Sequence, residues 1–166
     1  MMKAGRYTLA ARVLHWGVGV LVLVQIVLGF LADAAPRERA VSLRELHAEL
    51  GLLVLALMIL RLTWRIAVPP PPLPRTLAPW NRIAATAAHR LLYVLIFTML
   101  GSGMVVWMWI GGSLDLLGLI PVSLPDLSAR DEFWLSLAGY THEFGAWAIS
   151  GLIALHIAGA AYHEVV

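Results

Sequence analysis

Four long apolar stretches, separated by polar segments, dominate the sequence. They cover approximately residues 8–32, 43–66, 82–110 and 132–163. A helix needs about 20 apolar residues to cross the hydrocarbon core of a bilayer, and each stretch reaches that length. The pattern predicts an all-α membrane protein, a four-helix transmembrane bundle forming a single domain over residues 1–166.

The polar residues at the stretch boundaries predict where two of the helices begin. Thr8 precedes the first stretch and is a suitable N-cap. Ser42 and Glu45 fit a capping box, in which each side chain bonds the other residue's backbone amide, so the second helix should begin near Leu43. The prolines of residues 69–74 predict a stiff, extended linker before the third helix.

The first apolar stretch could instead belong to a signal peptide, with residues 33–36 as a weak candidate cleavage site. The apolar region of a signal peptide is shorter than this one, and His15 would have no use in a segment that is removed. A retained helix is therefore the favoured interpretation.

Composition supports a membrane location and narrows the candidate chemistry. Of the 166 residues 60% are hydrophobic and 13% charged, and the mean hydropathy is +0.81, values outside the usual range of soluble proteins. The chain has no cysteine, which excludes disulfides, iron–sulfur clusters and covalent haem attachment through a Cys-x-x-Cys-His motif. Histidine remains as the main candidate metal ligand.

The basic residues predict the orientation of the helices. The N-terminal side and the loop between the second and third stretches hold eight of them: Lys3, Arg6, Arg12, Arg61, Arg65, Arg75, Arg82 and Arg90. The other two connections hold four (Arg37, Arg39, Arg44 and Arg130), and nine of the ten acids lie on their side. The positive-inside rule therefore places both termini in the cytoplasm. Because the basic residues flank apolar spans, we do not expect nucleic-acid binding.

Histidines inside the apolar stretches are the strongest functional signal. His142 and His156 are fourteen residues apart, so on a helix they share one face within roughly 40° and lie about 21 Å apart along the axis. With the predicted orientation, His15 and His156 fall near the inner face of the membrane and His47 and His142 near the outer face. Gly51 follows His47 by one turn and should leave a groove beside the imidazole.

Facing imidazoles at two depths fit bis-histidine ligation of haem iron better than other uses. We predict two b haems, one held by His15 and His156 and one by His47 and His142. Zinc usually recruits three or four protein ligands, and no acidic cluster occurs at either level. A proton relay or transporter could also use intramembrane histidines, but it would not require pairs at two depths.

The chain also resembles the prokaryotic cytochrome b561 family over essentially its whole length. The resemblance lies in residues 12–16 (RVLHW), 47–51 (HAELG), 61–65 (RLTWR) and 88–93 (AHRLLY), and in His142 with His156. It implies a dihaem b protein of the bacterial inner membrane that passes single electrons between quinone, with ubiquinone the expected substrate, and another partner. Some relatives resemble superoxide oxidases. If the chain shares that activity, it is a superoxide:ubiquinone oxidoreductase. Others are haem b subunits of hydrogenase and formate dehydrogenase complexes.

Further polar residues near the inner face are candidates for supporting roles. His89 and His163 could bind a quinone headgroup, and His163 could also replace His156 as a ligand. Four arginines could pair with haem propionates or, equally, act as anchors that reach the lipid headgroups (Arg12, Arg61, Arg65 and Arg90). Two alternatives remain open for the whole chain: a relay subunit of a larger oxidoreductase, and a haem-free small transporter or scaffold.

Overall fold

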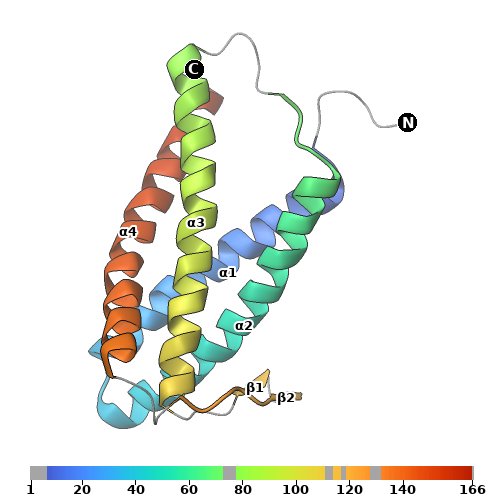
Figure 1. Cartoon of the computed structure of the whole chain (residues 1–166). Coiled ribbons are helices and arrows are strands. Elements are labelled where there is room, and N and C mark those ends of the chain that lie inside the picture. The colour runs from blue at the N-terminus through green and yellow to red at the C-terminus, as the bar shows by residue number, and fades with distance from the viewer. Residues whose placement is uncertain (1–6, 73–77, 111–113, 117–118, 128–131, 166) are drawn as a thin grey trace. The chain divides into compact units, whose positions relative to one another are not determined.

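The structure is a computed structural model that describes residues 7–72, 78–110, 114–116, 119–127 and 132–165. In chain order its elements are α1 (Leu9–Ala34), α2 (Arg37–Ala67), α3 (Pro79–Trp109), β1 (Leu114–Leu116), β2 (Ile120–Val122) and α4 (Glu132–Val165) (Figure 1). All four helices are long and apolar enough to cross a membrane. The predicted all-α membrane fold with four spans is therefore confirmed.

The N-cap prediction is confirmed for the first helix and the capping-box prediction is wrong for the second. Thr8 caps α1, and its hydroxyl accepts a hydrogen bond from the amide of Ala11 at 3.2 Å. The second helix begins at Arg37, directly after Pro36, with no side-chain cap. Ser42 therefore lies inside α2. The arginine, glutamate, alanine and leucine residues that precede the apolar stretch are good helix formers, so the helix extends through them.

The other helix ends differ from the predicted ones by a few residues at most. The third helix begins at Pro79, three residues early, because proline fits the first helical position, where its missing N–H has no partner to lose. The last helix begins at Glu132 as predicted and extends two residues beyond 163. Residues 69–72 of the predicted linker are not helical, and residues 73–77 lie outside the described residues.

The chain forms two compact units, and the first contains α1, α2 and the β-hairpin (Met1–Pro74 and Ser113–Ser123). Residues 35–36 join α1 to α2, so the two helices pack as an antiparallel pair. The side chains of Val18 and Val22 on α1, and of Val54 and Met58 on α2, are buried. This apolar packing sets which residues of the two helices face each other.

The β-hairpin was not predicted. Its strands pair antiparallel with Leu114 opposite Val122, and the buried Leu114 belongs to the strand that packs against α2. Each strand has only three residues, which is too short for an alternating apolar pattern to show in the sequence.

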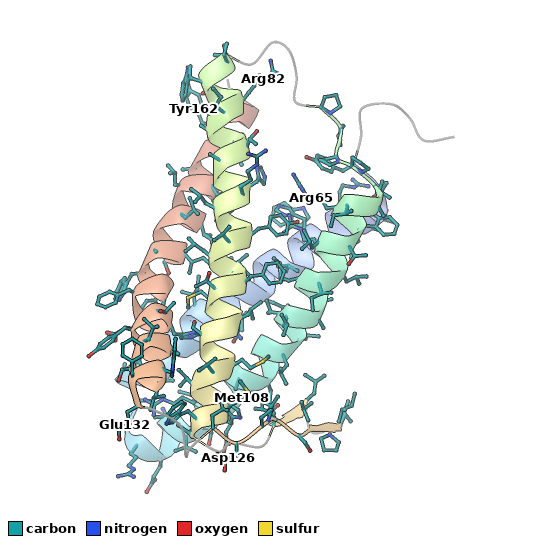
Figure 2. The ribbon with its side chains drawn as sticks, viewed as in Figure 1. Arg65, Arg82, Met108, Asp126, Glu132 and Tyr162 are labelled. Carbon is teal, nitrogen blue, oxygen red and sulfur yellow. The ribbon has the colours of Figure 1, made fainter. Side chains whose placement is uncertain are left out.

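The second unit pairs α3 with α4 (Arg75–Gly112 and Leu124–Val166). Its buried side chains include Ile96, Ser102, Ala138 and Ile149. In Figure 2, Arg82 and Tyr162 lie at one end of this pair, and Met108, Asp126 and Glu132 lie at the other. Within this unit, Arg82 therefore lies at the opposite end of the helix pair from Asp126 and Glu132.

Candidate histidine sites on the two helix pairs

The two histidines of the first unit lie at opposite ends of its helix pair. His15, in the second turn of α1, is hydrogen-bonded to Arg61 near the end of α2. His47, in the third turn of α2, faces Gly29 near the end of α1. The short turn between the helices produces this register, and it separates the two imidazoles by depth.

The second unit shows the same separation. His89 near the start of α3 lies against His156 near the end of α4, with ring centroids 5.1 Å apart and an interplanar angle of 81°. His142, fourteen residues before His156, contacts Ser102 and the backbone carbonyl of Met99 on α3. Fourteen residues of helix place these two levels about 21 Å apart.

His142 has the geometry of a metal-ligating histidine. Its Nδ1 lies 3.1 Å from the carbonyl oxygen of Met99 and 3.2 Å from the hydroxyl of Ser102. A carbonyl oxygen can only accept, so Nδ1 carries the proton and Nε2 carries the lone pair that binds a metal. A methyl group at Gly103 would come within 2.8 Å of the Cε1 atom of His142, so the imidazole occupies a notch that only glycine provides.

His47 lies beside Gly29 without the tight fit of His142, and its surroundings differ from those expected. A methyl group at Gly29 would lie 3.6 Å from its Cε1 atom. The groove predicted beside Gly51 is instead filled by Gln25, whose Nε2 would lie 3.2 Å from a methyl group there. The prediction was wrong because helical side chains lean toward the N-terminus, so His47 points away from Gly51 and toward the other helix.

Gln25 was not identified as a functional residue from the sequence. Its Nε2 donates a hydrogen bond of 2.8 Å to the backbone carbonyl of His47. A glutamine in the middle of an apolar stretch was the only signal that could have singled it out.

His15 differs from His142 in the position of its proton. Arg61 Nη2 lies 2.9 Å from Nδ1 of His15, and a guanidinium can only donate. Nδ1 therefore accepts, and the proton of the neutral imidazole is on Nε2. Arg61 was expected to pair with a haem propionate or to anchor in the lipid headgroups, and in this structure its guanidinium contacts the imidazole of His15.

The remaining candidates near this level are more scattered. Arg12 and Arg90 are exposed, and Arg65 is half-buried. The Nδ1 of His89 donates to the carbonyl of Ala85 at 2.6 Å, which leaves the lone pair on Nε2. The backbone of His163 is part of α4, but its side chain lies outside the described residues.

The donor set suits haem better than a metal held by protein ligands alone. Among the described residues, no three or more His, Cys, Asp or Glu side chains are grouped as a metal site would need. A porphyrin supplies four nitrogens itself, so that iron needs only axial histidines from the protein. Each predicted couple, His15 with His156 and His47 with His142, takes one histidine from each unit, so the couples stay predictions.

Four helices long enough to span a membrane, with histidines near both ends of each helix pair, fit a helical membrane protein of the haem-binding type. The sequence profile of the family described as prokaryotic cytochrome b561 matches residues 6–166. The chain is 30% identical over 156 residues to cytochrome b561 homolog 2 of Escherichia coli (strain K12), covering 91% of this chain and 80% of that protein. The chain belongs to the prokaryotic cytochrome b561 family. It is a multi-pass membrane protein that takes part in electron transfer through haem b.

Proposed function

We propose that this protein carries single electrons across the bacterial inner membrane, through two b haems, between an outer donor and the quinone pool. The observation that supports it best is the two-level arrangement of histidines in each unit, with about 21 Å between the levels on α4. Superoxide is the proposed outer donor and ubiquinone the proposed acceptor. Both termini lie in the cytoplasm in this proposal, as the distribution of basic residues indicates.

In the proposal, His47 and His142 hold the outer haem, and His15 and His156 hold the inner one. Bound haem iron supplies a centre that accepts and releases one electron at a time. The protein contributes imidazoles in fixed orientations and an apolar surrounding that keeps water away. The hydrogen bond from His142 to the carbonyl of Met99 already sets the tautomer that a ligand needs.

Arg61 has two proposed partners at the inner site, the imidazole of His15 and a propionate of haem. His15 can bind iron through Nε2 only after the guanidinium leaves Nδ1, because the present tautomer places the proton on Nε2. A carboxylate of haem is the kind of anion that attracts a guanidinium most strongly, through two parallel hydrogen bonds. With haem bound, Arg61 would therefore pair with a propionate in place of the His15 imidazole.

Quinone reduction near the inner level needs two protons as well as two electrons. His89 lies against His156, and its Nε2 carries a lone pair because Nδ1 donates to Ala85. Nε2 can accept a hydrogen bond from a hydroxyl group of the reduced quinone. His163 is the second proposed residue of this quinone site.

Replacing the histidines one at a time, and counting haem per chain, tests the proposal. His156→Leu and His47→Leu should each lose one haem and keep the other, whereas His89→Leu should keep both and lose quinone reduction. Purified wild-type protein should also reduce ubiquinone when supplied with superoxide. Two haems retained in His156→Leu or His47→Leu would refute the ligand assignment, and no turnover by the isolated wild type would indicate a relay that depends on a partner protein.

A further inference from the structure

A reciprocal contact between α1 and α2 surrounds His47. Gln25 and Gly29 are four residues apart on α1, and His47 and Gly51 are four residues apart on α2. The imidazole of His47 lies on Gly29, and the amide of Gln25 lies on Gly51. Each helix therefore places one polar side chain on a glycine of the other.

The contact includes a hydrogen bond to the backbone rather than to the imidazole. Gln25 Nε2 donates to the carbonyl oxygen of His47 at 2.8 Å. The carbonyl belongs to the residue whose ring would bind iron, so the bond fixes the position and tilt of that backbone segment relative to α1. The ring packs close to Gly29, where an added methyl group would lie 3.6 Å from Cε1 and 3.9 Å from Nδ1.

The oxygen of the Gln25 amide indicates that this side chain does more than stabilise the helix pair. Its Oε1 atom is buried and, among the described residues, has no hydrogen-bond partner. A buried acceptor without a partner is unfavourable, and an apolar side chain of the same length would avoid that cost. Methionine would fill the same space without either polar atom.

We propose that Gln25 is a positioning residue for His47 and, through it, sets the potential and affinity of the outer haem. This inference rests on the proposed function, because it takes His47 as a ligand of that haem. Residues that orient a metal ligand without touching the metal commonly change affinity or activity by 10- to 100-fold when they are altered. Gln25 acts from the first unit alone, where all four residues of the contact lie.

Gln25→Met and Gly51→Ala test the inference in two independent ways. Gln25→Met removes the hydrogen bond and also the buried acceptor, so it should keep its thermal stability while the outer haem changes. Gly51→Ala places a methyl group 3.2 Å from Gln25 Nε2, so the amide must shift by a few tenths of an ångström and its bond to His47 weakens. Gly17→Ala is the matched control on the same helix pair, since a methyl group there meets nothing within 4 Å.

The measurements are the midpoint potential of each haem, the low-spin ferric EPR signals, and haem per chain. The haem that His47→Leu removes identifies the outer signal. Gln25→Met should shift that signal and its potential, or release that haem, and leave the inner haem unchanged. A tenfold change in the ratio of ferric to ferrous affinity corresponds to ~59 mV for a one-electron couple. Gly51→Ala should shift the same haem by less, and Gly17→Ala should match the wild type.

The outcomes separate the inference from the function on which it rests. If His47→Leu retains both haems, His47 is not a ligand and the proposed function fails. If His47→Leu loses one haem but Gln25→Met matches the wild type in both potentials and both EPR signals, only the role of Gln25 is overturned. Should Gln25→Met fail to fold, Gly51→Ala decides: a change confined to the outer haem supports the role, and a wild-type outer haem overturns it.

Discussion

Gly103→Ala should displace His142 and thereby weaken the outer haem site. The Cβ atom of alanine at this position would lie 2.8 Å from Cε1 and 3.1 Å from Nδ1 of His142. Carbon atoms in good contact are about 3.5–4.0 Å apart, so the ring must move by roughly 0.7 Å or more. The clash cannot be relieved by moving the end of a flexible side chain, because the atoms in contact belong to the rigid imidazole ring.

The size of the effect follows from three contributions. Overpacking of this kind costs about 1–3 kcal/mol, and loss of the bond from Nδ1 to the Met99 carbonyl adds about 0.5–1.5 kcal/mol. Alanine returns up to about 1 kcal/mol because it favours a helix more than glycine does. The expected net result is a destabilisation of about 0.5–4.5 kcal/mol and a loss of outer-haem affinity of about 10- to 100-fold, typical of a ligand whose support is disturbed.

Gly101→Ala is a matched control, since it makes the same chemical change on the same helix and its methyl group meets nothing within 4 Å. Both variants would be purified in detergent and compared by haem per chain, reduced-minus-oxidised spectrum and thermal unfolding. We expect Gly101→Ala to equal or slightly exceed the wild type. If Gly103→Ala holds as much haem and unfolds at the same temperature as Gly101→Ala, the notch does not position His142 and the reasoning is wrong.

Three further predictions follow from the first unit. Arg61→Ala should lower the midpoint potential of the inner haem by ~59 mV, which is a tenfold change in the equilibrium constant of a one-electron couple, because it removes a cation that favours the reduced state. Arg61→Lys keeps the positive charge and should have a midpoint potential close to that of the wild type. A redox titration in which Arg61→Ala equals the wild type would contradict this. Thr8→Ala should cost about 1–3 kcal/mol, because Thr8 Oγ1 accepts from both Ala11 N and Trp64 Nε1, and Thr8→Ser should restore the thermal midpoint of unfolding. Arg44→Ala should change stability by no more than about 0.5 kcal/mol, since its ion pair with Asp33 spans 3.7 Å between side chains that are 58% and 76% exposed; a larger shift in thermal unfolding would show that the pair is stronger than its exposure allows.

The sequence was sufficient to predict the helices because membrane insertion is governed by local apolar length. Four apolar stretches gave four helices, and Thr8 gave the correct start of α1. The start of α2 was missed because the polar residues after Pro36 continue the helix outside the apolar stretch. A hydropathy pattern marks the membrane-crossing part of a helix, and it carries little information about polar turns added at its ends.

Within each unit, the sequence also predicted which histidines share an end of the helix pair, because two antiparallel helices bring the start of one beside the end of the other. His89 and His156 were both placed near the inner level, and their rings are in contact. The partners of individual atoms were not predictable in this way. Arg61 could equally have pointed to lipid headgroups, and which residue fills the space at Gly51 depends on side-chain directions that the helical period alone does not give.

The two levels of each helix pair differ in the kind of surroundings that their histidines have. At the proposed outer level, His47 and His142 each lie beside a glycine of the neighbouring helix. The Met99 carbonyl accepts a hydrogen bond from the ring of His142, and the backbone carbonyl of His47 accepts one from Gln25. At the proposed inner level, His15 contacts the side chain of Arg61, and His156 contacts that of His89. A site that exchanges only electrons benefits from rigid ligands, whereas a site next to quinone must also move protons. From this difference in surroundings we propose electron entry at the outer level and quinone chemistry at the inner one.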